Sequence, residues 1–214
     1  MFAIVDIETT GGSSTRDKIT EIAIIIHDGL SIVQTFSTLV NPEQKIPYNI
    51  TRLTGITDAM VRNAPKFYEI ARQVMLLLKD KIFVAHNVNF DYNFLRQEYQ
   101  SLGADFNFKK LCTVKLSRLL LPGHSSYSLG KLCKDLNIQV NGRHRAKGDA
   151  LATTELFNII LAKKNEHRSY KNLSIEALDK PKLNKFRQQL LEKLPEETGV
   201  YYFYDKEDEL IYIG

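Results

Sequence analysis

Two carboxylates stand two positions apart in an apolar segment near the start of the sequence. Asp6 and Glu8 lie within IVDIETT, residues 4–10. Side chains alternate along a β-strand, so both acids project to one face. Neighbouring carboxylates repel each other and are costly to desolvate, so such a pair shares a proton or holds a cation. A divalent metal ion is the expected occupant; an exposed strand edge where the acids only bind water is the alternative.

Three further ionisable residues could complete a site with this pair. Asp91 follows an apolar segment at the start of a predicted helix, and His144 stands five positions before Asp149 at the start of another. An Asp at a helix start is commonly only a cap, and a lone His in a loop is commonly a surface residue. Taken with the acid pair, however, they supply the oxygen ligands and the proton acceptor of a two-metal hydrolytic site.

Phosphodiester hydrolysis is the chemistry that this set fits. Two Mg²⁺ or Mn²⁺ ions about 4 Å apart can stabilise the attacking and the leaving oxygen in line, and a metal ion lowers the pKa of its bound water. A histidine such as His144, with an unperturbed pKa of about 6.5, can accept that proton at neutral pH.

The elements that must position these residues are predicted from periodicity and turn signals. Alternating apolar positions and an Asp-Gly turn at 28–29 predict an antiparallel meander of three strands. Residues 41–65, bounded by prolines, predict loops and short helices. Strands then alternate with helices, which favours an α/β fold with a mixed five-stranded sheet flanked by helices. The predicted strands are 2–8, 18–28, 31–40, 81–86 and the start of 110–121; the predicted helices are 66–80, 87–103, the rest of 110–121, 128–138 and 148–164.

Length, composition and charge limit the class of protein. A chain of 214 residues with 43% hydrophobic residues suits one domain plus an appendage. No apolar run approaches the roughly 18 residues of a membrane span and no basic leader precedes the first strand, so we expect a soluble, cytoplasmic protein without membrane contact. The two cysteines, Cys112 and Cys133, indicate neither a zinc site nor a disulfide and are expected to be buried thiols. The net charge of +4 is compatible with a polyanion partner.

Three ordered motifs carry a resemblance to a known family. D-x-E at 6–8, N-x-x-F-D at 87–91 and H-x-x-x-x-D at 144–149 resemble the DEDDh (DnaQ-like) 3′-to-5′ exonucleases, which have a ribonuclease H-like fold. The resemblance implies an exonuclease domain over residues 1–163. Segments similar to the proofreading exonuclease (epsilon) subunits of bacterial DNA polymerase III are ETTG at 8–11, LTGIT at 53–57 and SLGKLC at 128–133.

The resemblance also implies roles for individual residues. Asp6, Glu8 and Asp149 would hold the catalytic metal ion; Asp6 also reaches a second ion, which Asp91 helps to position. His144 would be the general base. His86, beside the site, could equally be a satisfied histidine at a strand end. The residues expected to contact substrate are Thr9, Thr10, Gly11, Thr54, Gly55, Asn87 and Phe90; Phe90 could stack on a terminal base or only pack against Phe94.

The C-terminal part of the sequence predicts two further segments. Residues 164–193 read as a basic helical linker that could lie on DNA, and Pro181 favours two helices over one. In residues 194–214, Gly-Val-Tyr and Tyr-Ile-Gly resemble the opening hairpin of a GIY-YIG endonuclease domain; a plain β-hairpin is the alternative. The catalytic residues of that family come later, so we expect a fragment of a longer protein and no endonuclease activity from these residues.

The leading functional hypothesis is a metal-dependent 3′-to-5′ exonuclease acting in DNA repair or proofreading. It would hydrolyse DNA from a single-stranded 3′ end, release nucleoside 5′-monophosphates, and work beside a DNA polymerase or repair complex. One alternative is an exoribonuclease of the same family. The others are a non-catalytic module that binds or tethers nucleic acid, and a different ribonuclease H-like enzyme such as an endonuclease.

Overall fold

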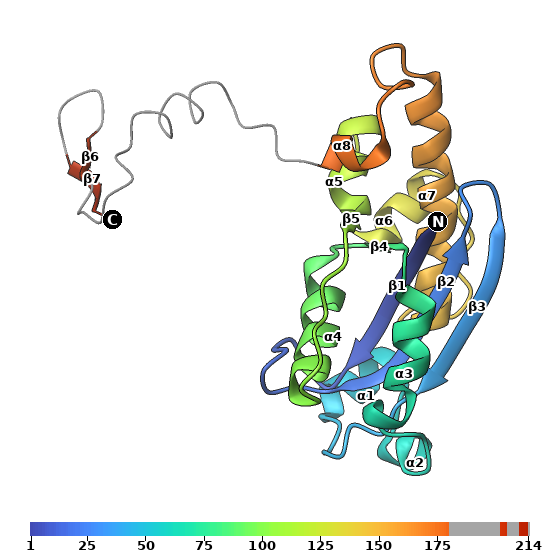
Figure 1. The fold of residues 1–214 in the computed structure, drawn as a ribbon, viewed down its shortest axis with the longest axis vertical. Helices are drawn as coiled ribbons and strands as arrows, with labels where there is room; N and C mark the ends of the chain where they lie inside the picture. Colours follow the sequence, from blue (N-terminus) through green and yellow to red (C-terminus); the bar gives the residue numbers. More distant parts are fainter. Residues whose placement is uncertain (180–201, 205–209, 214) are drawn as a thin grey trace. The chain divides into compact units, whose positions relative to one another are not determined.

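The computed structural model describes residues 1–179, 202–204 and 210–213 of the chain. The chain divides into two units, and the first is Met1–Asp179 (Figure 1). In the second unit, strands β6 (Tyr202–Tyr204) and β7 (Leu210–Ile213) pair antiparallel, which confirms the short hairpin predicted from the sequence. The Gly-Val-Tyr motif, Pro181 and the rest of the expected linker after Asp179 lie outside the described residues.

The first unit contains the predicted mixed sheet, in the order β3-β2-β1-β4-β5. The first three strands form the antiparallel meander, and β4 and β5 run parallel to β1. The strands are β1 (Phe2–Thr9), β2 (Ile19–His27), β3 (Ile32–Leu39), β4 (Ile82–Ala85) and β5 (Lys110–Cys112).

Helices cover both faces of this sheet (Figure 1). Apolar residues of α3 and α4 build the core on one face, and those of α5, α6, α7 and α8 build the core on the other. The short helices α1 and α2 enclose a small separate apolar cluster within the proline-bounded segment. The helices are α1 (Tyr48–Thr54), α2 (Asp58–Val61), α3 (Phe67–Leu78), α4 (Asn89–Ser101), α5 (Thr113–Leu120), α6 (Leu129–Asp135), α7 (Ala146–Glu166) and α8 (Ile175–Asp179).

Strand β1 divides its side chains between the two cores. Ala3, Val5 and Ile7 pack into the α3–α4 core, while Ile4 packs into the core built by α7. Because alternate residues share a face, Asp6 and Glu8 follow Ile4 onto the α7 side. The strand that holds the acid pair is therefore anchored by apolar burial on its opposite face.

The first unit extends further along the chain than the expected exonuclease domain. Helix α7 continues to Glu166, and Ile175 of α8 is buried in the α7-side core. Residues 164–179, which the sequence analysis assigned to the linker, are thus part of the folded unit. Both cysteines are buried free thiols, as predicted.

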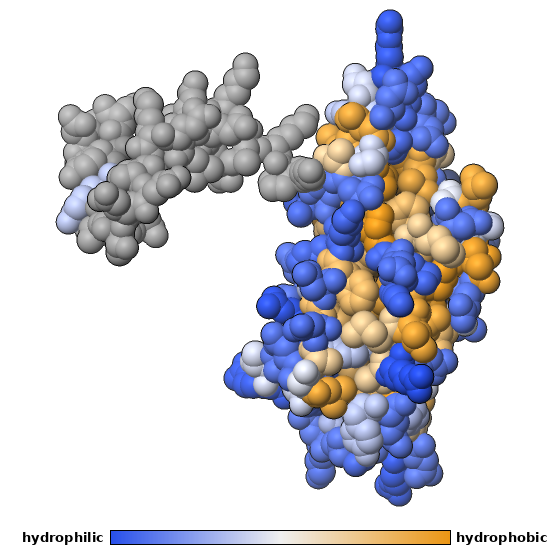
Figure 2. All heavy atoms as spheres, viewed as in Figure 1, coloured by the Kyte–Doolittle hydropathy of each residue, from blue (hydrophilic) through white to orange (hydrophobic). Residues whose placement is uncertain are grey.

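The edge of the sheet carries exposed apolar side chains. Figure 2 shows apolar surface near the turn into β3, where Leu30 is 91% exposed and Val33 is 56% exposed. Among the described residues, no helix is long and apolar enough to cross a membrane. The cytoplasmic location remains a prediction.

Candidate active site

Three of the predicted metal ligands converge at the C-terminal half of β1. Asp6 and Glu8 come from this strand, and Asp149 comes from the first turn of α7, which packs against β1 and β2. Carboxylate oxygens of the three residues lie within 4.8 Å of one another. All three are oxygen donors, which suit hard divalent cations such as Mg²⁺ and Mn²⁺.

The fourth acid, Asp91, lies deeper than the other three. It stands in the first turn of α4, is only 4% exposed, and its Oδ1 accepts a hydrogen bond of 3.2 Å from the backbone N–H of Ile7. Strands β1 and β4 pair only as far as Ile4 and Val84, so this N–H lies beyond the last β4 pair. Asp91 thus bonds β1 just beyond the point where its pairing with β4 ends.

Burial raises the pKa of all four carboxyl groups, and repulsion from neighbouring acids adds to the shift at Asp6, Glu8 and Asp91. Desolvation raises the pKa of Asp6 well above its ordinary value. Repulsion from four neighbouring acids adds to this shift, in decreasing order Asp91, Asp149, Glu8 and Glu21. Burial, with Asp149 and Glu21, likewise raises the pKa of Glu8 to about 7, against the opposing charge of Arg145.

Burial also dominates at the two helix starts. It raises the pKa of Asp91 to about 8, although the Ile7 N–H opposes this shift, and it raises the pKa of Asp149, although the His144 N–H opposes it. A divalent cation bound here would favour the charged form of these carboxyl groups and so oppose the shifts of their pKa values. The site has the electrostatics of a cation-binding site.

His144 is tied to this cluster through its backbone. The residue adopts a φ of 59°, in the left-handed region, and its N–H donates a 3.2 Å hydrogen bond to Oδ2 of Asp149. The backbone of His144 is therefore fixed beside a predicted metal ligand, and its side chain is half-buried. This placement suits the role of proton acceptor.

His86 has a structural role instead. Its Nε2–H donates to the carbonyl of Tyr127, which can only accept, and its Nδ1 accepts from the Thr113 hydroxyl; both distances are 2.9 Å. Burial lowers the pKa of His86, which keeps the ring neutral and fixes this arrangement. Both ring nitrogens are thus occupied within the protein.

The residues after β1 are held by internal hydrogen bonds. The hydroxyl of Thr9 donates to the carbonyl of Gly11, and the hydroxyl of Thr10 accepts from the N–H of Lys18. A Cβ on Gly11 would lie 2.5 Å from the Asp17 carboxylate, so any larger residue there would displace that carboxylate. What this segment offers a ligand is therefore backbone rather than these hydroxyls.

The second expected contact segment shows the same pattern. The hydroxyl of Thr54 donates to the carbonyl of Ile50 and accepts from the N–H of Ile56. Gly55 ends α1 with a φ of 73°, a left-handed conformation that favours glycine. These two residues shape the loop that follows α1.

Asn87 and Phe90 line a pocket of about 250 Å³ with Gly12 and Ser14. Asn87 is exposed, and Phe90 is half-buried with its ring 4.9 Å from that of Phe94. Packing against Phe94 is thus observed, and the partly exposed ring still faces a pocket next to Asp91. Both interpretations of Phe90 made from the sequence are compatible with this position.

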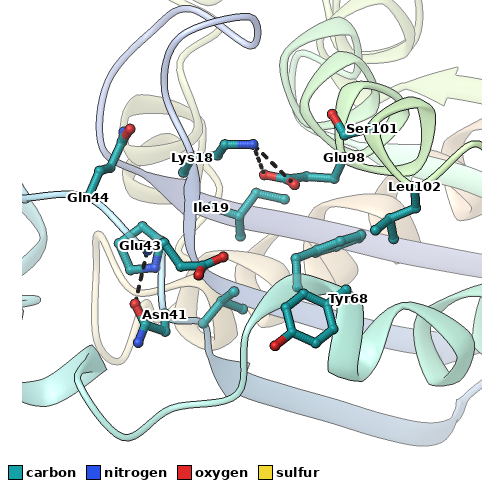
Figure 3. A pocket seen from close by; sticks show the side chains of 12 residues that line it. Lys18, Ile19, Asn41, Glu43, Gln44, Tyr68, Glu98, Ser101 and Leu102 are labelled. Carbon is teal, nitrogen blue, oxygen red and sulfur yellow. Dashed lines mark hydrogen bonds and ion pairs between the residues drawn. The ribbon is translucent and has the colours of Figure 1, made fainter.

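A larger hollow of about 290 Å³ lies elsewhere (Figure 3). Ile19 and Phe67, which line it, belong to the α3–α4 core, on the face of the sheet opposite the acid cluster. Lys18 and Glu98 form an ion pair across it at 3.4 Å. Its position separates it from the candidate active site.

Glu21 and Arg145 form a pair at the site that was not predicted from the sequence. Glu21 lies directly opposite Glu8 in the β1–β2 register, and its buried carboxylate binds the guanidinium of Arg145. The available signal was one acidic residue within the largely apolar segment ITEIAIIIH. A buried charge of this kind needs a partner.

Comparisons with known proteins agree with this site. The chain belongs to the exonuclease family RNase_T, whose profile matches residues 3–157. This match confirms the resemblance to the DEDDh exonucleases. Exonucleases of this family depend on divalent metal ions, which the acid cluster fits.

Three relatives differ in how much of their length the chain covers. It is 39% identical over 164 residues to the 3′-5′ exonuclease DinG of Bacillus subtilis, covering 76% of this chain and 18% of DinG. It is 37% identical over 161 residues to DNA polymerase III subunit epsilon of Aquifex aeolicus, covering 75% of this chain and 80% of that subunit. A protein of Mycobacterium tuberculosis named as a bifunctional exonuclease/endonuclease is 34% identical over 224 residues, covering 100% of this chain and 35% of that protein. The chain thus spans less than a fifth of DinG and about a third of the mycobacterial protein.

Among solved structures, the chain is similar to exonuclease X in complex with 5′ overhanging duplex DNA. The TM-score is 0.67 at 28% identity, covering 84% of this chain and 100% of exonuclease X. This similarity confirms the ribonuclease H-like fold.

Proposed function

We propose that the chain is a metal-dependent 3′-to-5′ exonuclease that removes nucleoside 5′-monophosphates from the 3′ end of DNA. The observation that carries this proposal is the convergence of three carboxylates within 4.8 Å of one another, with the backbone of His144 bonded to one of them. The DinG relative is named a 3′-5′ exonuclease, and the exonuclease X structure contains DNA. Both support the direction and the substrate.

Each acid has a role in this proposal. Asp6, Glu8 and Asp149 would hold one divalent cation, with Mg²⁺ and Mn²⁺ as the candidates. Asp6 and Asp91 would help to position a second. Bound cations supply stabilisation of the charge that develops on the phosphate and lower the pKa of the attacking water. The rigid strand β1 orients the first two ligands, which loops alone would hold less well.

His144 accepts the proton of the attacking water on its imidazole. Its position immediately before α7 places it beside Asp149, and its backbone bond to that carboxylate holds it there. The terminal nucleotide would lie against the backbone of Thr9 to Gly11 and the loop of Thr54 and Gly55. The pocket beside Asn87 and Phe90 would receive its base.

The relatives support a partner and a pathway for this proposal. The epsilon relative is a polymerase subunit, which supports proofreading beside a polymerase. The mycobacterial relative covers the whole chain, the C-terminal hairpin included. We infer that the exonuclease domain works together with the basic segment of residues 164–193, which would contact DNA. The resemblance of residues 194–214 to a GIY-YIG hairpin stays a prediction, and we expect no endonuclease activity from these residues.

The experiment that tests this proposal measures the shortening of 5′-labelled single-stranded DNA in the presence of Mg²⁺, Mn²⁺ or EDTA. We expect a metal-dependent ladder shortened from the 3′ end, lost in Asp6→Asn and His144→Ala. Glu155→Gln, an exposed position on the same helix as Asp149, is the matched control and keeps full activity. A ladder that persists in EDTA or in Asp6→Asn would refute the proposal.

An exoribonuclease is the second candidate, because the acid cluster does not distinguish the sugar. Matched DNA and RNA oligonucleotides decide between the two by their relative rates. DNA binding in Mg²⁺ with no turnover on either oligonucleotide would favour a tethering module.

A further inference from the structure

Glu21 is the most heavily bonded buried carboxylate beside the site. Its Oε1 accepts from Nη2 of Arg145 at 2.7 Å, and its Oε2 accepts from Nε of Arg145 at 3.0 Å and from the backbone N–H of Ala146 at 2.9 Å. Its side chain is 5% exposed. The planar guanidinium matches the carboxylate with two parallel hydrogen bonds, a geometry that an ammonium group cannot reproduce.

The partners of Glu21 are the residues at which α7 begins. Arg145 is the N-cap and Ala146 is the first helical residue. His144 immediately precedes them, and Asp149 follows in the first turn. One buried carboxylate on β2 therefore fixes the start of the helix that carries a metal ligand and the proton acceptor.

The loop before α7 is packed tightly against that helix. A Cβ on Gly148 would collide with the carbonyl oxygens of Asn141 and Gly142, so only glycine allows this approach. The N–H of His144 then bonds Asp149. The loop and the first turn of α7 form one connected segment, and Glu21 is its attachment to the sheet.

We propose that Glu21 and Arg145 are positioning residues that hold His144 and Asp149 against the Asp6–Glu8 pair. This inference rests on the proposed exonuclease function for its kinetic consequence. Neither residue needs to touch substrate. The guanidinium of Arg145 is bonded to Glu21, and the carboxylate of Glu21 is bonded to Arg145 and to the N–H of Ala146 at the start of α7. Since Glu21 lies opposite Glu8 in the register, the attachment is made at the level of the acids themselves.

The decisive variant is Arg145→Lys, which keeps the charge but loses the two parallel bonds. If Arg145 acts only as a positive charge, this variant behaves as the wild type. If it positions α7, kcat on single-stranded DNA falls about 10- to 100-fold while KM changes by less than about threefold. Arg72→Lys, at an exposed position on α3, is the matched control. Glu21→Gln tests the other partner and should show the same loss of kcat.

A second measurement does not depend on catalysis. Since Asp149 is a proposed ligand, Arg145→Lys should weaken Mn²⁺ binding, measured by calorimetry, about tenfold, with the fold checked by circular dichroism. A folded Arg145→Lys protein with Mn²⁺ affinity and kcat both within twofold of the wild type would overturn the positioning role. An inactive wild type whose Mn²⁺ affinity still falls in the variant would refute the exonuclease function and support the positioning role.

Discussion

Removing divalent metal should make the folded unit less stable at alkaline than at mildly acidic pH. The pKa of Glu8 is raised from 4.5 to about 7, so the folded state holds this proton more tightly than the unfolded state does. The resulting stabilisation is fully present below the unfolded pKa and is lost as pH rises through the folded pKa. The pKa values of Asp6, Asp91 and Asp149 are raised as well, and these groups add to the effect.

The size of this effect follows from the linkage relation. Between about pH 5.5 and pH 8.5, a group with a folded pKa of about 7 loses roughly 2 kcal/mol of its contribution to the free energy of unfolding. Partial solvent exposure of Glu8 reduces this to about 1 kcal/mol. For a unit of this size, each kcal/mol changes the melting temperature by about 2–4 °C. We expect the melting temperature in EDTA to fall by at least a few degrees over this range.

Thermal unfolding followed by circular dichroism measures this fall. Glu8→Gln removes one titrating group and should make the fall smaller, and added Mg²⁺ should raise the melting temperature more at pH 8.5 than at pH 5.5. A melting temperature in EDTA that is constant or rises with pH would refute the reasoning. An equal fall in Glu8→Gln would show that Glu8 is not one of its sources.

Two other predictions concern packing around the site. Asp91→Asn retains an acceptor for the Ile7 N–H, whereas Asp91→Leu leaves that N–H unpaired. Asp91→Leu should therefore lower the free energy of unfolding, measured in urea, by about 1–3 kcal/mol. Equal stability of the two variants would contradict this role of Asp91. Gly148→Ala should destabilise the unit by about 1–3 kcal/mol, because the added methyl group meets the carbonyl of Gly142. An unchanged urea midpoint would contradict the close approach of this carbonyl to α7.

The sequence predicted the sheet and the faces of β1 well, for a physical reason. Alternation along one strand is a local property, and it placed Asp6 and Glu8 together on the face that meets α7. The Glu21–Arg145 pair was not predictable in this way. Strand β2 is buried at every position, so alternation does not distinguish its faces, and a pair 124 residues apart leaves no spacing signal.

The residues expected to contact substrate show a second limit. Thr10 and Thr54 were singled out by motif; their hydroxyls bond the protein's own backbone, and their contact with substrate stays a prediction. Whether a threonine faces a ligand or stabilises a turn depends on loop geometry that its neighbours in sequence do not reveal. The end of the folded unit was similarly hidden, because the burial of Ile175 depends on the distant residues of the α7-side core.

The end of the β1–β4 pairing at Ile4 and Val84 sets stability against activity. If the two strands stayed paired beyond this point, the sheet would gain ladder hydrogen bonds, but the space that Asp91 now occupies would close. A more regular sheet would thus be a less competent enzyme. Selection of this chain for heat resistance alone should favour substitutions that extend the pairing, and the most heat-resistant variants should lose the bond between Asp91 and Ile7 first.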